Sequence, residues 1–263
     1  MTQVAIVTGS ATGLGAACAV DLASRGWNVA INYTKSRREA DETYSKVKAH
    51  GVDAILVQAD MGQDIDCRKL AEETLKKWGR IDGLINNAGA TKFQKSGDLD
   101  GFTAEDFDRI LWVNVAGPYM MSRAVWPNMK KQWEKSRQRG SIVNISSTAG
   151  ATGLGSSIPY VASKGALNTL TLTLALWLSP AVRVNAICPG FIQSRWLRDG
   201  LGLAEYEKMK QAMEQTTPLR QAGTPEQMAE AALFFLTSAS HVTGEILLVD
   251  AGNHLGTVPM KGR

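Results

Sequence analysis

Short apolar runs rich in β-branched residues recur along the chain, and segments with helical spacing separate them. Because these runs are apolar on consecutive positions, they are typical of parallel strands that helices cover on both faces. The pattern predicts one α/β domain over residues 1–263, built on a doubly wound, seven-stranded parallel sheet with helices on both faces. The expected strands are 3–8, 28–33, 54–59, 81–86, 140–146, 182–187 and 245–249.

Helical spacing is found at 14–25, 37–50, 65–78, 104–125 and 160–178. The last of these is apolar on most sides, so we expect it to pack against the sheet and a neighbour, or against another subunit. After the sixth strand, 191–217 interrupts the alternation and is expected to form a small lid. The Lys- and Arg-rich segment 126–139 is expected to be a solvated helix end and loop, with a recognition role left open.

Composition limits the classes of partner. The 29 Lys and Arg and 25 Asp and Glu give a net charge of +4 and are spread along the whole chain, which argues against nucleic acid as a partner. Cys18, Cys67 and Cys188 are widely spaced, which favours reduced thiols and no metal site. A strand that begins at residue 3 and the lack of a long apolar run predict a cytoplasmic protein without a membrane segment.

A glycine cluster, TGSATGLG at 8–15, lies between the first expected strand and the first expected helix. Gly9, Gly13 and Gly15 allow a sharp turn and a close approach of the backbone to a pyrophosphate, which would face the positive end of the helix dipole. The spacing differs from the commoner Gly-x-Gly-x-x-Gly, and glycines also punctuate ordinary turns. The strand-turn-helix context nevertheless favours a dinucleotide site.

The residues after the second strand bear on the choice of dinucleotide. No carboxylate occurs from residue 32 until Glu39, whereas Lys35, Arg37 and Arg38 could pair with a 2′-phosphate. NADP(H) is therefore preferred, with NAD(H) left open. The alternative interpretation is that these cations are the solvated first turn of the next helix.

Tyr160 and Lys164 are four residues apart in a helical segment, so both side chains project from one face. An ammonium beside a phenol favours the phenolate, and a phenol with its ordinary pKa of about 10 would be a poor proton acceptor near neutral pH. Such pairs also occur by chance on many helices, so the neighbouring motifs decide their meaning.

Those motifs appear in a familiar order: Thr8-Gly9-x3-Gly13-x-Gly15, Asn86-Asn87-Ala88-Gly89, Asn114, Ser147, Tyr160-x3-Lys164 and Pro189-Gly190. With these residues, nearly the whole chain resembles the short-chain dehydrogenase/reductases, in particular the 3-oxoacyl-(acyl-carrier-protein) reductase-like branch. The resemblance implies a single-domain Rossmann fold and an NAD(P)-dependent oxidoreductase.

The resemblance also implies a catalytic tetrad. Ser147 would orient the substrate oxygen, and Tyr160 would exchange a proton with it. Lys164 would lower the pKa of Tyr160 and bind the nicotinamide ribose. Asn114 would hold a water molecule in a proton relay to Lys164.

Together with the glycine loop and the run after the second strand, the resemblance predicts the cofactor-binding residues. They are Gly9, Ser10, Thr12, Gly13, Leu14, Gly15, Tyr33, Thr34, Lys35, Ser36, Arg37, Asp60, Met61, Asn87, Ala88, Gly89, Tyr160, Lys164, Pro189, Gly190, Ile192 and Ser194. The predicted substrate-binding residues are Ser147, Ala149, Leu154, Phe191 and Trp196. Asn86 is expected to fix the sheet.

The preferred function is NADPH-dependent reduction of a ketone or 3-oxoacyl substrate. An NAD-dependent alcohol, sugar or sterol dehydrogenase is the alternative, and a dinucleotide-sensing protein without catalysis is disfavoured because the tetrad is intact. The family resemblance also predicts a homotetramer that pairs through 104–125 and 160–178. Docking of an acyl carrier protein stays open, with a candidate basic rim of Arg123, Lys130, Lys131, Arg195 and Arg198.

Overall fold

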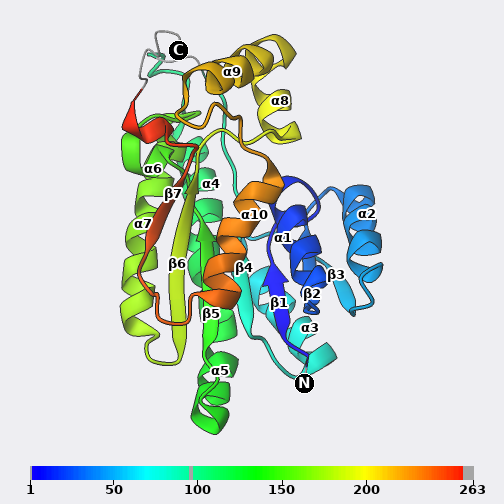
Figure 1. Ribbon diagram of the computed structural model, residues 1–263. Helices are drawn as coiled ribbons and strands as arrows, with labels where there is room; N and C mark the ends of the chain where they lie inside the picture. Colours follow the sequence, from blue (N-terminus) through cyan, green and yellow to red (C-terminus); the bar gives the residue numbers. More distant parts are fainter. Residues whose placement is uncertain (1, 95–96, 257–263) are drawn as a thin grey trace.

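The computed structural model describes residues 2–94 and 97–256. In it, seven parallel strands form one sheet in the order β3-β2-β1-β4-β5-β6-β7, which confirms the predicted sheet (Figure 1). The strands are β1 (Val4–Val7), β2 (Asn28–Tyr33), β3 (Ala54–Gln58), β4 (Gly83–Asn86), β5 (Gly140–Ile145), β6 (Val182–Pro189) and β7 (Ile246–Val249).

The strand order reverses at β1, which pairs with β2 on one side and β4 on the other. Crossovers from β1 run first toward β3 and later, from β4 onward, toward β7. This reversal leaves a crevice at the carboxyl ends of β1 and β4, where doubly wound sheets bind ligands. All residues of β1, β4 and β5 are buried, as expected of strands covered on both faces.

Helices cover both faces of the sheet. One face carries α1, α2 and α10, with α1 packed against both of the others, and the other face carries α3, α5 and α7 (Figure 1). The helices are α1 (Gly13–Ser24), α2 (Arg37–Lys48), α3 (Asp64–Trp78), α4 (Ala104–Leu111), α5 (Gly117–Ser136), α6 (Ala149–Thr152), α7 (Ile158–Trp177), α8 (Arg195–Leu201), α9 (Leu203–Thr216) and α10 (Pro225–Leu233). Three short turns are η1 (Trp112–Ala116), η2 (Phe234–Ser238) and η3 (Asn253–Leu255).

The expected helix 104–125 differs from the structure in two respects. It is divided by the π-helical turn η1 between α4 and α5, and α5 continues to Ser136. Most of the basic segment 126–139 is therefore helical, and its Trp133 lies under the guanidinium groups of Arg137 and Arg139. Apolar contacts on the inner side of α5, including buried Val125 and Met129, explain why the helix extends so far.

The segment after β6 leaves the sheet and forms α8 and α9 above the carboxyl ends of the strands (Figure 1). The chain then returns through α10 to β7. α8 and α9 occupy the segment 191–217 for which a lid is expected, and this segment is called the lid below. Over the ranges that the structure describes, no helix has the combination of length and apolarity needed to cross a lipid bilayer.

Candidate active site

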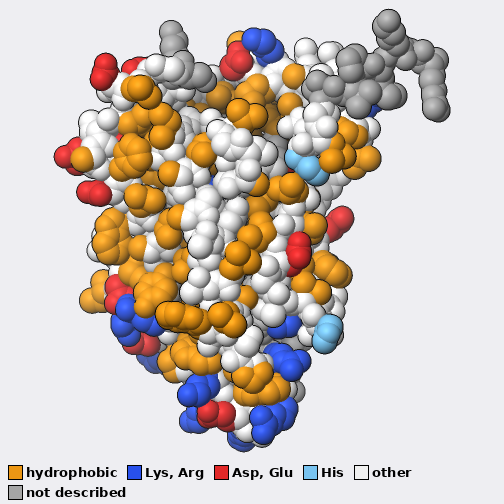
Figure 2. All heavy atoms as spheres, turned by 90° about the vertical axis from the view of Figure 1, so that its left-hand side faces the viewer, with side chains coloured by type: hydrophobic (Ala, Val, Ile, Leu, Met, Phe, Trp, Pro, Cys, Tyr) orange, Lys and Arg blue, Asp and Glu red, His pale blue; other side chains and the backbone are white. Residues whose placement is uncertain are grey.

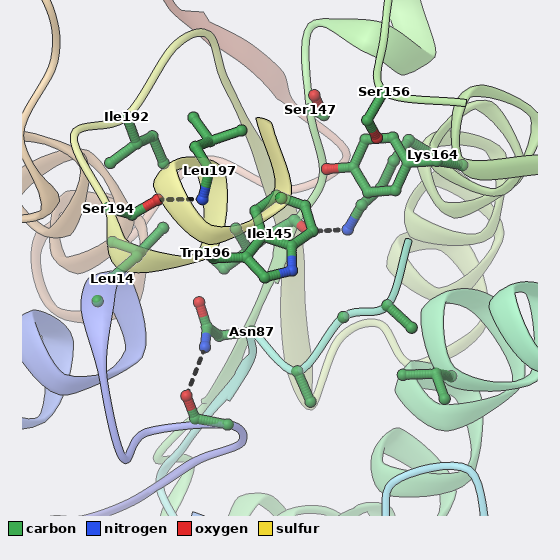
Figure 3. Close-up of a pocket in the computed structure, with 18 of the residues that line it drawn as sticks. Leu14, Asn87, Ile145, Ser147, Ser156, Lys164, Ile192, Ser194, Trp196 and Leu197 are labelled. Atoms are coloured by element: carbon green, nitrogen blue, oxygen red, sulfur yellow. Dashed lines mark hydrogen bonds between the residues drawn. The ribbon is translucent and has the colours of Figure 1, made fainter. Parts of the chain in front are cut away.

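A cavity of about 1760 Å³ lies at the carboxyl ends of the strands, beneath α8 and α9. It extends from the glycine loop after β1, past the ends of β2 and β4, to the segments that follow β5 and β6 (Figure 3). Segments far apart in the sequence therefore contribute to one elongated site.

The glycines of the 8–15 loop have distinct roles. Gly9 has a φ of +61°, and a Cβ there would lie 2.9 Å from the Cα of Ala88. Gly13 has a φ of +58° and opens onto free space. A Cβ on Gly15 would come within 2.5 Å of the carbonyl oxygen of Gly9 and closer still to Asn87. The loop thus needs glycine for its turns at Gly9 and Gly13, and for close packing at Gly15.

Asn87 fastens this loop to the end of β4, since its Nδ2 donates to the carbonyl oxygens of Thr8 and Gly9, 3.0 Å from each. Thr12, the N-cap of α1, makes no capping hydrogen bond with its side chain. The first amides of α1 therefore keep their capacity to bind an anion at the positive end of the helix dipole. The cradle fits the diphosphate of a dinucleotide.

Two predicted cofactor residues build the loop instead of lining the cavity. The Oγ of Ser10 is buried, donates to the carbonyl oxygen of Val7 at 2.7 Å and accepts from the amide of Asn32 at 3.0 Å. Gly15 is buried behind the loop. The loop consists almost entirely of small residues, so its sequence pattern does not distinguish the buried Ser10 and Gly15 from Gly9 and Thr12, which line the cavity.

At the far end of the cavity, Tyr33, Thr34, Lys35 and Ser36 follow β2 and line the wall. The predicted phosphate ligand Arg37 does not line it. Its Nε donates to Asp41 at 2.9 Å, and its Nη1 donates to the hydroxyl of Tyr33 at 3.0 Å. The helical i, i+4 spacing of Arg37 and Asp41 favours this pairing along the outside of α2.

Asp60 and Met61, which come after β3, also line the cavity. The Oδ1 of Asp60 accepts from the amide of Gly62 at 2.9 Å, and this hydrogen bond fixes the orientation of the carboxylate. Ala88 and Gly89 line the middle of the cavity after β4. Asn86 lies outside it and donates through Nδ2 to Oδ1 of Asn144 on β5 at 2.8 Å, in agreement with a role in the sheet.

Ser147, Tyr160 and Lys164 meet in the cavity. The first turn of α7 positions Tyr160, whose amide donates to the capping Oγ of Ser157 at 3.3 Å. The Nζ of Lys164 donates to the carbonyl oxygen of Ile145 at 2.8 Å and lies 5.5 Å from the centre of the Tyr160 ring (Figure 3). The Oγ of Ser147 accepts from the amide of Ala149 at 3.1 Å, so its own hydrogen can be donated to a ligand.

Burial shapes the protonation of this group. It raises the pKa of Tyr160 to about 12, and the neighbouring Ser147 hydroxyl opposes that rise. Burial also lowers the pKa of Lys164 to about 8. Both shifts favour the neutral forms, since each charged form loses hydration in the protein interior.

Asn114 lies in η1 and is fully buried, outside the cavity wall. Its Oδ1 accepts from the amide of Ala90 at 2.7 Å, and its Nδ2 donates to the carbonyl oxygen of Ala90 at 2.9 Å. The same Nδ2 donates at 2.9 Å to the Oγ of Ser163, which in turn donates to the carbonyl oxygen of Tyr160. Asn114 therefore connects the loop after β4 to the helix that carries Tyr160 and Lys164.

The end of β6 provides another wall through Pro189, Gly190 and Ile192. A Cβ on Gly190 would lie 2.7 Å from that of Asp250, so glycine permits close packing there. Ser194 lines the cavity and also caps α8, accepting from the amide of Leu197 at 3.3 Å (Figure 3).

The predicted substrate residues Ala149, Leu154, Phe191 and Trp196 all line the cavity. The Trp196 indole projects into it, between Lys164 and Leu197 in Figure 3. It makes an edge-to-face contact with Phe93, with ring centroids 5.6 Å apart. The lining residues that were not predicted include Ser156, Met209 and Met213. For the two methionines, their i, i+4 spacing within the segment 191–217 was the signal that could have identified them.

The family model described as enoyl-(acyl carrier protein) reductase matches residues 9–254 of the chain. A Streptomyces violaceoruber protein that bears the name of a ketoacyl reductase of the granaticin polyketide synthase is 39% identical over 252 residues, with 96% of each chain covered. The 3-oxoacyl-[acyl-carrier-protein] reductase of Staphylococcus aureus is 32% identical over 257 residues, covering 97% of this chain and 99% of the relative.

A solved structure of acetoin dehydrogenase from Salmonella typhimurium superposes with a TM-score of 0.82 at 32% identity, covering 97% of this chain and 98% of that one. Agreement of this extent involves the sheet, the helices on both faces and the segments around the cavity together. The chain therefore belongs to the short-chain dehydrogenase/reductase family, in its 3-oxoacyl reductase-like branch, and is an NAD(P)-dependent oxidoreductase.

Proposed function

We propose that this protein is an NADPH-dependent reductase of ketones or 3-oxoacyl compounds and that Ser147, Tyr160, Lys164 and Asn114 are its catalytic tetrad. One observation carries the proposal: Ser147, Tyr160 and Lys164 line the same part of a cavity, and the rest of that cavity suits a dinucleotide. The glycine cradle at Gly9 and Gly13 and the uncapped start of α1 support binding of the diphosphate.

The bound nicotinamide would supply hydride to the carbonyl carbon of the substrate. Ser147, with its hydrogen free to donate, would orient the carbonyl oxygen, and Tyr160 would transfer its phenolic proton to that oxygen. Lys164 as ammonium would stabilise the phenolate left on Tyr160 and would bind the nicotinamide ribose. Asn114 would hold the helix of Tyr160 and Lys164 in position against the loop after β4. It would also bind the water molecule of the proton relay to Lys164.

The remaining cofactor-binding assignments follow the cavity wall. Thr12, Gly13 and Leu14 would meet the diphosphate, Tyr33 to Ser36 and Asp60 the adenosine, and Asn87 to Gly89 the middle of the molecule. Pro189, Gly190, Ile192 and Ser194 would flank the nicotinamide. A mostly apolar wall that includes Leu154, Phe191 and Trp196 suits a hydrophobic substrate.

Assembly and location complete the proposal. We infer a cytoplasmic, single-domain protomer that forms a homotetramer. Exposed apolar side chains along η1, α5 and α7 support pairing: Trp112, Tyr119, Ile158, Leu172, Leu176 and Trp177. Figure 2, which views the side of α7, shows hydrophobic side chains spread over much of this face, with Lys and Arg gathered at its lower end. The cations at this lower end lie away from the cavity, and Lys130 and Lys131 belong to the second half of α5, so an acyl carrier protein that delivers the substrate would bind nearer Arg195, which lines the cavity.

The test is a substrate panel of diketones, 3-oxoesters, 3-oxoacyl thioesters, sugars and steroids, with oxidation of NADPH and of NADH followed separately. We expect reduction of at least one ketone or 3-oxoacyl compound with NADPH, and a loss of at least about a hundredfold in kcat in Tyr160→Phe. Tyr119→Phe, at an exposed tyrosine of α5, is the matched control. Unchanged kcat in Tyr160→Phe would refute the catalytic assignment, and faster turnover with NADH would refute the cofactor assignment.

A further inference from the structure

The wall after β2 has few cations available for a 2′-phosphate. Of the basic run at 35–38, only Lys35 lines the cavity. Arg37 is bound to Asp41 and Tyr33, and its guanidinium lies over the Tyr33 ring, 5.5 Å from the centroid. Arg38 points outward, with its side chain 85% exposed and its Nε 3.7 Å from Glu42. The run by itself leaves one lysine at the site.

A second cation reaches this region from a distant part of the sequence. Arg195, the first residue of α8, lines the cavity, and its Nη1 lies 2.6 Å from Oε1 of Glu39. Glu39 belongs to the first turn of α2, so the guanidinium of Arg195 lies at the N-terminal end of that helix. The lid thus carries a positive charge across the mouth of the cavity to the end where Lys35 lies.

The N-terminus of α2 also lies at this end of the cavity, and its helix dipole adds positive character there. Its N-cap, Ser36, lines the cavity and makes no capping hydrogen bond with its side chain, while the amide of Arg37 donates to the carbonyl oxygen of Lys35 at 3.0 Å. Lys35, Ser36 at the start of α2, and Arg195 all line the cavity, so this part of its wall has positive character. Two carboxylates pair with Arg195: Glu39, whose Oε1 lies 2.6 Å from Nη1, and Asp199 of α8, whose Oδ2 lies 3.8 Å from Nε.

We propose that Arg195 is a binding residue for the 2′-phosphate of NADP(H), and that this phosphate replaces Glu39 as its partner. The inference rests on the NADP(H) preference of the proposed function. A phosphate carries more charge than a carboxylate and accepts two parallel hydrogen bonds from a guanidinium. The arginine side chain is 46% exposed and long, so its guanidinium would turn from Glu39 to a phosphate by a change of rotamer.

The same arrangement provides selectivity. A dinucleotide with a free 2′-hydroxyl offers no charge to compete with Glu39, so Arg195 stays in its ion pair. With the 2′-phosphate, Arg195 would connect the lid to the bound cofactor. Cofactor choice would then depend on a residue 156 positions away from Glu39 in the sequence.

The experiment measures binding without turnover. Wild type, Arg195→Ala, Glu39→Gln and Arg198→Ala are titrated with NADPH and NADH by quenching of tryptophan fluorescence, and with adenosine 2′,5′-bisphosphate and AMP by calorimetry. Arg198 is the matched control, because it lies on the same helix with a similar exposure but does not line the cavity.

We expect Arg195→Ala to weaken NADPH and the bisphosphate by about ten- to a hundredfold and to change NADH and AMP less than twofold. Arg198→Ala should match the wild type, and Glu39→Gln should bind NADPH more tightly, since it releases Arg195. If Arg195→Ala weakens the binding of all four ligands equally, Arg195 instead holds the lid in place, and the proposal is overturned. If the wild type prefers NADPH and Arg195→Ala keeps that preference, only this inference fails; if the wild type prefers NADH, the proposed cofactor fails.

Discussion

The indole of Trp196 lies against the phenol ring of Tyr160, with centroids 6.0 Å apart and ring planes inclined by 50°. Trp196 belongs to the lid helix α8, and Tyr160 belongs to α7 on the sheet. The lid therefore contacts the proposed proton donor directly. A substrate that approaches Tyr160 must share this space with the indole, so the position of α8 should influence which substrates react.

Replacing the indole should change substrate selection. In Trp196→Ala we expect the ratio of kcat/KM for a bulky ketone to that for a small one to rise about tenfold, because the cavity gains room beside Tyr160. Trp196→Phe, which keeps an aromatic ring, should lie between this variant and the wild type. Steady-state kinetics on paired substrates check the prediction, and a parallel change for both substrates would contradict it.

The lid is also held through Phe93, whose ring lies directly against the backbone of Gly200. A Cβ at Gly200 would come 2.0 Å from Cε2 of Phe93, so the ring or the helix must move in Gly200→Ala. We expect KM for the substrate to rise about tenfold in this variant and to recover in the double variant with Phe93→Ala, since the two sites share one contact. Additive losses in the double variant would show that the contact does not control the lid.

Gly15 should be required for cofactor binding because there is no room for a side chain at this position, and not because of its backbone conformation. Its Cβ would collide with the carbonyl oxygen of Gly9, which would distort the diphosphate cradle. We expect Gly15→Ala to weaken binding of both nicotinamide cofactors more than about tenfold in a fluorescence titration. Gly79→Ala is the control: its φ of +70° brings about 1–2 kcal/mol of strain in an open position at the end of α3, with cofactor binding unchanged.

Lys164 should make the free energy of unfolding of the ligand-free protein depend on pH. Burial lowers its pKa from 10.5 to about 8, so between these pH values the unfolded chain holds a proton that the folded chain has released. The free energy of unfolding then rises with pH in this window. Relative to Lys164→Met, the wild type should gain about 2–3 kcal/mol between pH 8 and 10.5.

Urea unfolding of wild type and Lys164→Met across this range provides the measurement. Lys135→Met, at an exposed lysine of α5, serves as the control and should follow the wild type. A constant difference between wild type and Lys164→Met at all pH values would contradict the expected burial of the ammonium.

The exposed apolar end of α7 should be an assembly surface. Leu176 and Trp177 are 75% and 73% exposed and lie with the exposed Leu172 on α7, the helix on the side of the molecule that Figure 2 views. We expect Leu176→Asp to lower the mass in solution to that of a smaller species, because a carboxylate would be buried in the interface. Ile65→Asp changes an equally exposed side chain on α3 and should leave the mass unaltered. Light scattering after size exclusion distinguishes these outcomes.

Much of the fold could be predicted because its signals are local. Apolar runs such as 140–146 and 182–187 mark buried parallel strands, and the structure places β5 and β6 there as neighbours. The π-helical turn η1 could not be predicted, because residues 112–116 carry helical spacing and only their packing against the loop after β4 and α7 selects the wider turn. The extension of α5 to Ser136 likewise depends on contacts with the sheet and α3.

The sequence by itself determined the motifs whose chemistry depends on short spacing: the glycine loop, and the Tyr160 and Lys164 pair one helical turn apart. Only the tertiary structure decided which predicted residues line the cavity. It buried Ser10 under the loop, where the amide of Asn32 donates to it, and brought Arg195 to Glu39, whereas Arg37 pairs with Asp41 one turn away on its own helix. The physical reason is that Asn32 and Glu39 come from segments distant from Ser10 and Arg195, and such partners become neighbours only when the sheet and the lid have folded.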